Sequence, residues 1–419
     1  MINIYKYLCL IFMFNICFSQ KLLIPMDHMQ TDHLKAYGIA FLNLKKNINV
    51  EWLLNYRGGS FLFDDSPDIK TICTVRGVIY ESVDAIKLSS ILVEIEANNM
   101  DIILLEKEPK IAIYSPPDKQ PWDDAVTLAL TYAEIDYDVI FDDEVINGKI
   151  SDYDWLHLHH EDFTGQYGKF YRSYRNAPWY KKMEVDFNKS ANKHGFSSVH
   201  DFKKYIALKI KQYIVDGGFL FAMCSATDSF DIALAAQGID VVDSPFDQTP
   251  IDPNYKSKLN YSYSMAFENF SLITNPMIYE YSNIDYPSND KPNLKTAEKD
   301  YFTLFEFSAK WDPVPTMLTQ NHVGIINGFM GQTTGFNRQY LKKHVLVLAE
   351  VENDPQVKYI HGNSGKGTFT FLGGHDPEDY THKVGDPVTN LSLHRNSPGY
   401  RLILNNVLFP AAKKKDRKT

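Results

Sequence analysis

The chain has 419 residues, of which 44% are hydrophobic and 23% are charged, a composition typical of globular proteins that allows two domains or one domain with large insertions. Its formal net charge of -9 argues against nucleic acid as a partner. We expect a small-molecule ligand and no cofactor, and the sequence does not determine the oligomeric state.

The first 19 residues have the pattern of a signal peptide. Lys6 provides a positive charge, Leu8–Phe14 an apolar core, and the segment before Ser19 small residues for cleavage. This core is too short to cross a bilayer as a helix, and no later stretch is apolar enough to do so. We therefore expect an exported protein, located in the periplasm or outside the cell, without a transmembrane segment.

Residues 20–109 are expected to form a small α/β unit, because apolar runs of strand length alternate with helical patterns. The expected strands are Lys21–Met26, Val50–Tyr56 and a short one starting at Gly77–Tyr80, and the expected helices are His33–Lys46, Asp68–Val75 and Ile86–Asn98. After cleavage, Cys73 in this unit and Cys224 are the remaining cysteines. They either form a disulfide or stay as free thiols.

Residues 110–412 are expected to form a larger α/β domain, with insertions at about 165–195 and 243–340 and a basic tail at 413–419. The expected strands are Ile111–Tyr114, Tyr137–Phe141, Asp154–His157 and Phe219–Met223, and the main helices are Asp123–Ile135 and His200–Val215. This alternation predicts a doubly wound parallel sheet, which binds ligands at the carboxyl ends of its strands. The first insertion, rich in Tyr, Arg and Lys, is a candidate lid.

The segment around Cys224 carries the clearest functional signal. Phe219–Met223 is wholly apolar, as expected of a strand buried on both faces, and Cys224–Asp228 is small and polar, as a tight turn requires. A helix is expected to follow over Asp231–Gly238, with Ser229 as its N-cap. Cys224 would then lie near a helix N-terminus, where backbone N–H groups favour an anion.

The residues around Cys224 carry a family resemblance. Small residues two positions before and after a nucleophile allow the sharp turn that presents it, and Ala222 and Ala226 occupy these positions. The pattern A-M-C-S-A resembles the G-x-C-x-G elbow of class I glutamine amidotransferases, which implies a flavodoxin-like sheet and a cysteine nucleophile. The segment is also similar to the ThuA-like branch of that superfamily, with Cys224 where the family usually has His, through Gly217, Gly218, Ala226, Thr227 and Asp228. The alternative interpretation of Cys224 is an inert core thiol.

A polar cluster, His157–Asp162, follows the third expected strand of this domain. The period of two places His157 and His159 on one face of the strand. Histidine and carboxylate groups suit a metal ion, but capping of the strand and hydrogen bonding to the elbow is the favoured interpretation, so we expect no metal. The residues expected to line a substrate pocket are His159, His160, Glu161, Asp162, Thr227, Asp228 and Asp376.

The last expected strand ends at Gly373-Gly374-His375. This segment resembles the final strand of ThuA-like proteins, G-x-G-R-V-F-x-x-x-G-H, and amidotransferases carry His-x-Glu at the same strand end. The resemblance implies that His375 is the base for Cys224, oriented by Glu378 or Asp376. Glu378 lies one residue further from His375 than the amidotransferase spacing.

These motifs favour an exported Cys–His hydrolase acting on a small polar substrate of sugar or amide type. A non-catalytic carbohydrate- or small-ligand-binding protein on the same scaffold is the alternative. The segments Met26–Gly38 and Trp52–Phe61 are similar to exported bacterial proteins labelled asparagine synthetase B. We do not expect that activity, because Ile2 stands where a glutamine-dependent synthetase has Cys and no S-G-G-x-D-S loop is present.

Overall fold

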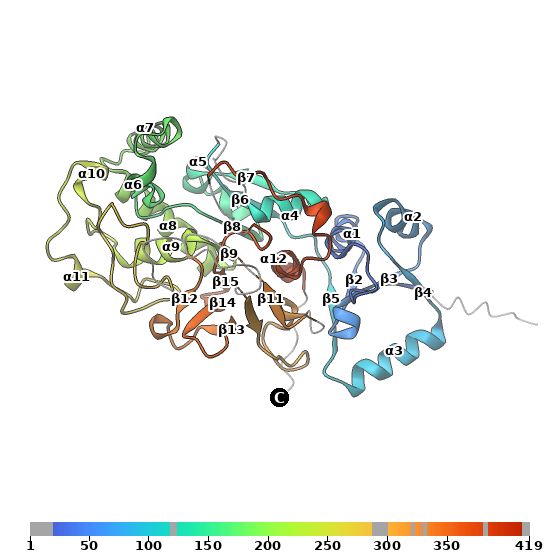
Figure 1. The fold of residues 1–419 in the computed structure, drawn as a ribbon. Helices are drawn as coiled ribbons and strands as arrows, with labels where there is room; N and C mark the ends of the chain where they lie inside the picture. The colour runs from blue at the N-terminus through green and yellow to red at the C-terminus, as the bar shows by residue number, and fades with distance from the viewer. Residues whose placement is uncertain are drawn as a thin grey trace, which may run out of the picture.

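The computed structural model describes residues 20–117, 124–286, 301–319, 323–327, 329, 333–379 and 384–412, which form two β-sheets with flanking helices (Figure 1). The expected signal peptide at 1–19 and the basic tail at 413–419 lie outside these residues. None of the helices in the described part of the chain combines the length and the apolar character needed to cross a membrane.

The N-terminal sheet is antiparallel throughout. Its five strands follow the order β4-β1-β3-β2-β5, with bounds Lys21–Ile24 (β1), Val50–Leu54 (β2), Ser60–Asp64 (β3), Glu81–Val83 (β4) and Asp101–Leu105 (β5). Helices α1 (His33–Lys45) and α2 (Pro67–Arg76) cover one face and α3 (Ala85–Ala97) covers the other (Figure 1). Alternation along β1 explains this layering, because Leu22 and Ile24 join the core beneath α1, whereas Leu23 joins the one beneath α3.

The larger sheet is parallel in one half and antiparallel in the other. The parallel half follows the order β7-β6-β8-β9-β15, with bounds Asp138–Ile140 (β7), Ile111–Tyr114 (β6), Trp155–Leu158 (β8), Phe219–Met223 (β9) and Gly367–Leu372 (β15). The antiparallel half continues through β14 (Gln356–Ser364), β13 (Leu346–Glu350), β10 (Tyr301–Leu304) and β11 (Ile325–Asn327), and β12 (Phe336–Asn337) pairs with β14. The α/β class is confirmed. The doubly wound parallel sheet that was expected accounts for only half of the larger sheet, because the short Gly365–Lys366 turn makes β14 antiparallel to β15.

Helices cover both faces of the parallel half. Helices α4 (Ala125–Ala133) and α12 (Pro398–Leu408) share a core with Ile111 and Ile113, and α8 (Val199–Asp216) and α9 (Ser225–Ala235) share one with Ala112 and Tyr114. Beyond them lie α5 (Asp142–Ile146), α6 (Tyr171–Tyr174), α7 (Pro178–Lys193), α10 (Ser244–Asp247) and α11 (Tyr255–Lys258). The sheet is therefore the middle layer of three.

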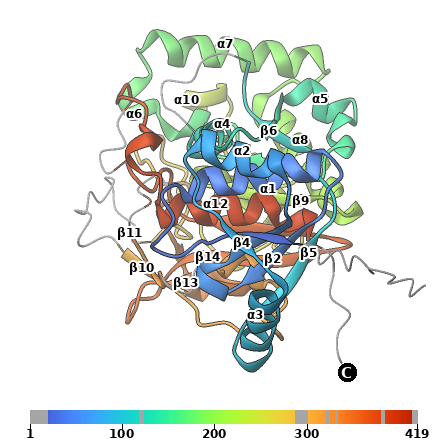
Figure 2. The same cartoon turned by 90° about the vertical axis from the view of Figure 1, so that its right-hand side faces the viewer.

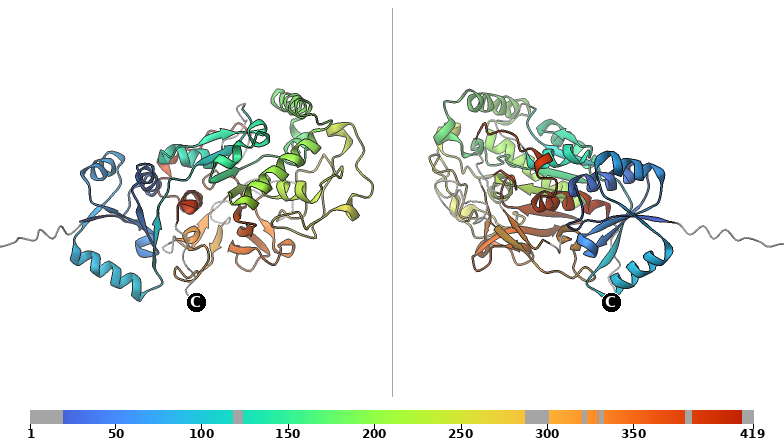
Figure 3. Two further views of the ribbon diagram at one scale, coloured as in Figure 1. Left: turned by 180° about the vertical axis from the view of Figure 1, so that it is seen from behind. Right: turned by 45° about the vertical axis from the view of Figure 1, so that its right-hand side comes forward.

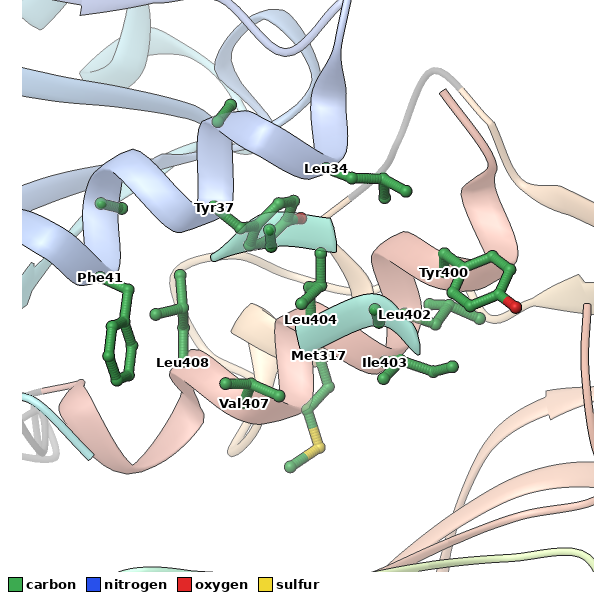
Figure 4. Close-up of a cluster of buried hydrophobic side chains, with 14 of the residues drawn as sticks. Leu34, Tyr37, Phe41, Met317, Tyr400, Leu402, Ile403, Leu404, Val407 and Leu408 are labelled. Atoms are coloured by element: carbon green, nitrogen blue, oxygen red, sulfur yellow. The ribbon is translucent and has the colours of Figure 1, made fainter. Parts of the chain in front are cut away.

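The two sheets are joined through α12, which lies between α1 and the larger sheet (Figures 1 and 2). Seen from behind, the N-terminal sheet again lies at one end of the molecule (Figure 3). Leu404 and Leu408 of α12 are fully buried and face Tyr37 and Phe41 of α1 (Figure 4). The hydroxyl of Tyr37 donates to Asn405 Oδ1 at 2.5 Å, so these two buried polar groups pair across the interface.

Four expected segments differ from the structure. The helix after β9 begins at Ser225 instead of Asp231, so Ser229 is not its N-cap, because the turn at Cys224 is a single residue long. The insertion at 165–195, expected to be an irregular loop, is largely helical, since α7 occupies 16 residues of it. The segment 243–340 contributes β10, β11 and β12 to the larger sheet. In the N-terminal unit, the short strand expected to start at Gly77 is β4, because Gly77 has a left-handed conformation and ends α2.

Candidate functional site

Cys224 forms a sharp elbow between β9 and α9. Its backbone adopts φ 49° and ψ −140°, a conformation that residues with a Cβ atom rarely adopt and that costs on the order of 1–3 kcal/mol. Thr227 stabilises the elbow from within, because its N–H and its hydroxyl both donate to the carbonyl oxygen of Cys224, at 3.2 and 2.7 Å. Strain of this kind at the end of a buried strand is typical of a positioned nucleophile.

Backbone hydrogen bonds join three strand ends at the elbow. The N–H of Cys224 donates to the carbonyl oxygen of Gly374 at 3.0 Å, and the N–H of Ala226 donates to that of His159 at 3.1 Å. Gly374 has φ 103°, and a Cβ atom there would lie 2.0 Å from the carbonyl oxygen of Phe329, so this position requires glycine. The segments after β8, β9 and β15 therefore meet at one place, as expected at the carboxyl edge of parallel strands.

Three histidines lie against one another at this edge. The ring centroids of His159 and His375 are 4.3 Å apart, and His160 lies 5.2 Å from His159 and 5.9 Å from His375. One nitrogen from each of the three rings lies within 4.8 Å of the other two, a spacing that a single cation could bridge. His159 and His375 are buried, whereas His160 is partly exposed.

Asp124, which the sequence analysis did not select, is the carboxylate that supports this cluster. It caps α4 by accepting hydrogen bonds from Val126 and Thr127, and it lies 3.3 Å from Nδ1 of His159 and 3.6 Å from Nε2 of His157. The signal that could have found it is its place at the start of the helix that follows the first strand of the parallel half. An aspartate at the start of a helix usually acts only as its N-cap, so its position alone does not indicate a functional role.

The two histidines beside Asp124 have pKa values shifted in opposite directions. Burial alone would raise the pKa of Asp124, but the adjacent His159 and His157 hold it well below its usual range. Burial also disfavours a charged His159, yet the Asp124 carboxylate outweighs burial and raises the pKa of His159. For His157 burial prevails and lowers the pKa, and its Nδ1 lies 3.0 Å from the carbonyl oxygen of Phe221.

Three further carboxyl groups lie in the segments next to the elbow, two after β8 and one in the first turn of α9. Burial raises the pKa of Glu161 to about 7, and its Oε2 accepts a hydrogen bond from the N–H of His159 at 2.8 Å. Burial also raises the pKa of Asp228 to about 7; its Oδ1 accepts from Thr333 at 3.1 Å, and its Oδ2 has no hydrogen-bond partner among the described residues. Asp162 accepts hydrogen bonds from Thr164 and from a backbone N–H, so it shapes the loop that it begins.

The residues after His375 separate into two environments. Asp376 is buried and accepts hydrogen bonds from Tyr400 at 2.8 Å and Thr389 at 2.9 Å, which ties the strand end to α12. Glu378 contacts His394, at 3.1 Å from its Nδ1. In the described structure Asp124, and not Glu378, is therefore the carboxylate that lies against a histidine of the cluster.

No disulfide joins Cys73 and Cys224 in the structure, and both side chains are buried. Cys73 lies in α2 within the apolar core, and burial raises its pKa to about 12. The thiol of Cys224 lies instead near the partly buried Tyr279 and the buried Tyr281. Cys73 therefore provides an internal reference for an inert thiol.

The candidate lid also lines a groove. Helix α7 and the start of α5 enclose a volume of about 690 Å³ beside the ends of β6 and β7, which contribute Ser115 and Phe141. Trp179 and Phe187 of α7 give one wall an aromatic surface, and Lys182 and Lys193 lie at the same groove. The groove lies at the carboxyl edge of the parallel strands, the usual ligand-binding side of such sheets.

No family model matches the chain, and no curated protein matches it. Solved structures that align with the chain include the cytoplasmic proteins STM3548 and STM1381 of Salmonella typhimurium. They are 11% and 12% identical, align over 73% of this chain and 100% of their own length, and have TM-scores of 0.35 and 0.33. A β-galactosidase from Bacillus circulans sp. alkalophilus is 10% identical over 64% of this chain and 29% of its own, with a TM-score of 0.24. Likenesses of this size carry no conclusion about function.

Proposed function

We propose that the chain is an exported hydrolase with an amidotransferase-like, ThuA-like catalytic domain, in which Cys224 attacks a small polar substrate of amide or sugar type. The observation that carries the proposal is the elbow: a cysteine with a positive φ between a buried strand and a helix, hydrogen-bonded to the residue that precedes His375. The parallel strand order β7-β6-β8-β9-β15 corresponds to the 2-1-3-4-5 order of flavodoxin-like sheets, which supports the same architecture.

In the proposed reaction on an amide, the Cys224 thiol gives its proton to His375 and the sulfur attacks the carbonyl carbon. The C–N bond then breaks, and the leaving amine takes the proton from the imidazolium. Water attacks the resulting thioester while giving a proton to His375, the C–S bond breaks, and Cys224 recovers that proton as the carboxylic acid leaves. The backbone N–H of Ser225, at the start of α9, is suited to stabilise the negative charge on the carbonyl oxygen, whereas those of Ala226 and Thr227 already donate to the carbonyl oxygens of His159 and Cys224.

A panel of substrates tests the proposal on the full-length chain. The panel contains L-glutamine, followed by ammonia release, and nitroanilides, nitrophenyl esters and nitrophenyl glycosides, followed by absorbance. Turnover of any member should disappear in Cys224→Ala and persist in Cys73→Ala, the matched cysteine control. A slow acyl substrate should also add its acyl mass to the Cys224 peptide.

Turnover that survives in Cys224→Ala would contradict the proposal. Saturable binding of panel compounds without turnover, measured by calorimetry, would favour the non-catalytic ligand-binding alternative instead.

A further inference from the structure

The histidine cluster has the geometry of a ligand set as well as that of a catalytic base. His159, His160 and His375 each offer one ring nitrogen, and these three nitrogens lie within 4.8 Å of one another. Imidazole rings that only pack against one another do not require their nitrogens to lie close together. Three nitrogens converging on one point are what a bound cation requires.

The surroundings of His159 fix which of its nitrogens faces the other rings. Its Nδ1 lies 3.3 Å from the Asp124 carboxylate and 3.2 Å from Nε2 of His157. Its Nε2 is buried and has no hydrogen-bond partner among the described residues. A carboxylate on the far nitrogen of a histidine is the arrangement that orients metal-binding imidazoles and increases their basicity.

The donor atoms select the kind of ion. The cluster offers imidazole nitrogens and no carboxylate oxygen, and such sites suit Zn²⁺ and neighbouring transition metals, whereas Mg²⁺ and Ca²⁺ prefer oxygen ligands. Three protein ligands also leave one position of a tetrahedral ion open for water or substrate, as in catalytic zinc sites.

We propose that His159, His160 and His375 bind one Zn²⁺ ion at the elbow, with Asp124 as the positioning carboxylate of His159. This differs from the capping role that the sequence favoured for His159 and His160. The binding itself does not depend on Cys224. Its consequence rests on the proposed function: a neutral imidazole has one basic nitrogen, so His375 cannot bind the ion and accept a proton at the same time, and Zn²⁺ should inhibit Cys224-dependent turnover.

Metal binding is tested on the full-length chain after treatment with a chelator. Titration with Zn²⁺ in competition with a chromophoric chelator should give one equivalent, and Co²⁺ should give the visible absorption of a four-coordinate ion. Gln in place of His159, His160 or His375 should each weaken binding by more than the roughly 10- to 100-fold typical of outer-shell changes, and Asp124→Asn should weaken it within that range.

Two variants separate this site from its alternatives. His200→Gln alters a second group, His200 with Asp240 and Asp247, whose ligand atoms also lie within 4.8 Å of one another, and it should leave the equivalent in place. Cys224→Ser should bind Zn²⁺ as the unmodified chain does. The zinc-site proposal is therefore tested independently of the proposed catalytic role of Cys224. Absence of a saturable equivalent and of the Co²⁺ absorption, or loss of the equivalent in His200→Gln alone, would overturn the proposal.

Discussion

Around α12, the buried side chains are mostly apolar and pack between α1 and the larger sheet, whereas around the ends of β8, β9 and β15 many buried side chains are ionisable. Leu404 and Leu408 represent the first region, and His159, Asp228 and Cys224 the second. Both regions exclude water to a similar extent. The two regions therefore differ in the kind of side chain that is buried and not in the degree of burial. Burying apolar side chains stabilises the folded state, whereas burying ionisable side chains costs free energy unless they are paired.

The α12 interface should show the largest effect of a single substitution on stability. Leu404 is fully buried among α1, α4 and α12, so Leu404→Ala removes apolar contacts and leaves a cavity. We expect a loss of about 2–5 kcal/mol in the free energy of unfolding, measured by urea denaturation. Leu393→Ala, at a side chain that is 77% exposed, is the control and should change it by less than about 0.5 kcal/mol.

His361 on β14 tests a buried ionisable group outside the site. Burial lowers its pKa from 6.5 to about 4, and its Nδ1 lies 2.9 Å from the hydroxyl of Thr370. The unfolded chain therefore binds one more proton between these pH values, so the contribution of His361 is complete above pH 6.5 and is lost as the pH falls towards 4.

The expected loss is up to about 3 kcal/mol between pH 6.5 and 4, measured by urea denaturation across that range. His361→Gln should flatten this part of the profile. A variant with the same slope as the unmodified chain would show that another group is responsible.

Asp228 beside the elbow should show a smaller effect of the opposite sign. Its pKa is raised to about 7 in the folded state, so stability is complete below the unfolded value near 3.8 and is lost as the pH rises through 7. Asp228→Asn removes the buried charge and keeps an acceptor for Thr333, although its amide N–H₂ faces a position without a partner among the described residues.

We expect Asp228→Asn to stabilise the chain by about 1–2 kcal/mol at pH 8 and to lose that advantage at pH 5.5. Urea denaturation at both pH values measures the difference. Equal destabilisation at the two pH values would show that Asp228 supports the fold and that its charge is not opposed by burial.

The sequence predicted best where apolar patterning alone decides the structure. Phe219–Met223 was expected as the central strand and is β9, and the helix before it was placed within one residue of α8 at each end. A short apolar run bounded by Gly217 and by a polar segment allows few alternatives. The α/β class followed from the same alternation.

The sequence failed where geometry depends on contacts between distant segments. The backbone of Cys224, with its positive φ, is hydrogen-bonded to Gly374, 150 positions later. The local sequence does not show this contact, and the polar residues Ser225–Asp228 were therefore expected to form a turn instead of the first turn of α9. Asp124 was missed for the same reason, because only the assembled sheet brings it to His159. The proximity of His157–Asp162, Cys224 and His375 could be predicted, because all three lie at the carboxyl ends of strands that were expected to be parallel.

The central claim is that the elbow presents Cys224 as a reactive thiol, and the rate of alkylation at each cysteine tests it most directly. The full-length chain is treated with iodoacetamide at neutral pH without denaturant, and modification of each cysteine peptide is followed by mass spectrometry. Cys73 is the internal reference, since burial raises its pKa to about 12. We predict modification of Cys224 at least about 100-fold faster than of Cys73, with the difference reduced in His375→Gln. Equal and slow modification of both cysteines, rising together only on unfolding, would show that Cys224 is an inert core thiol and would contradict the account.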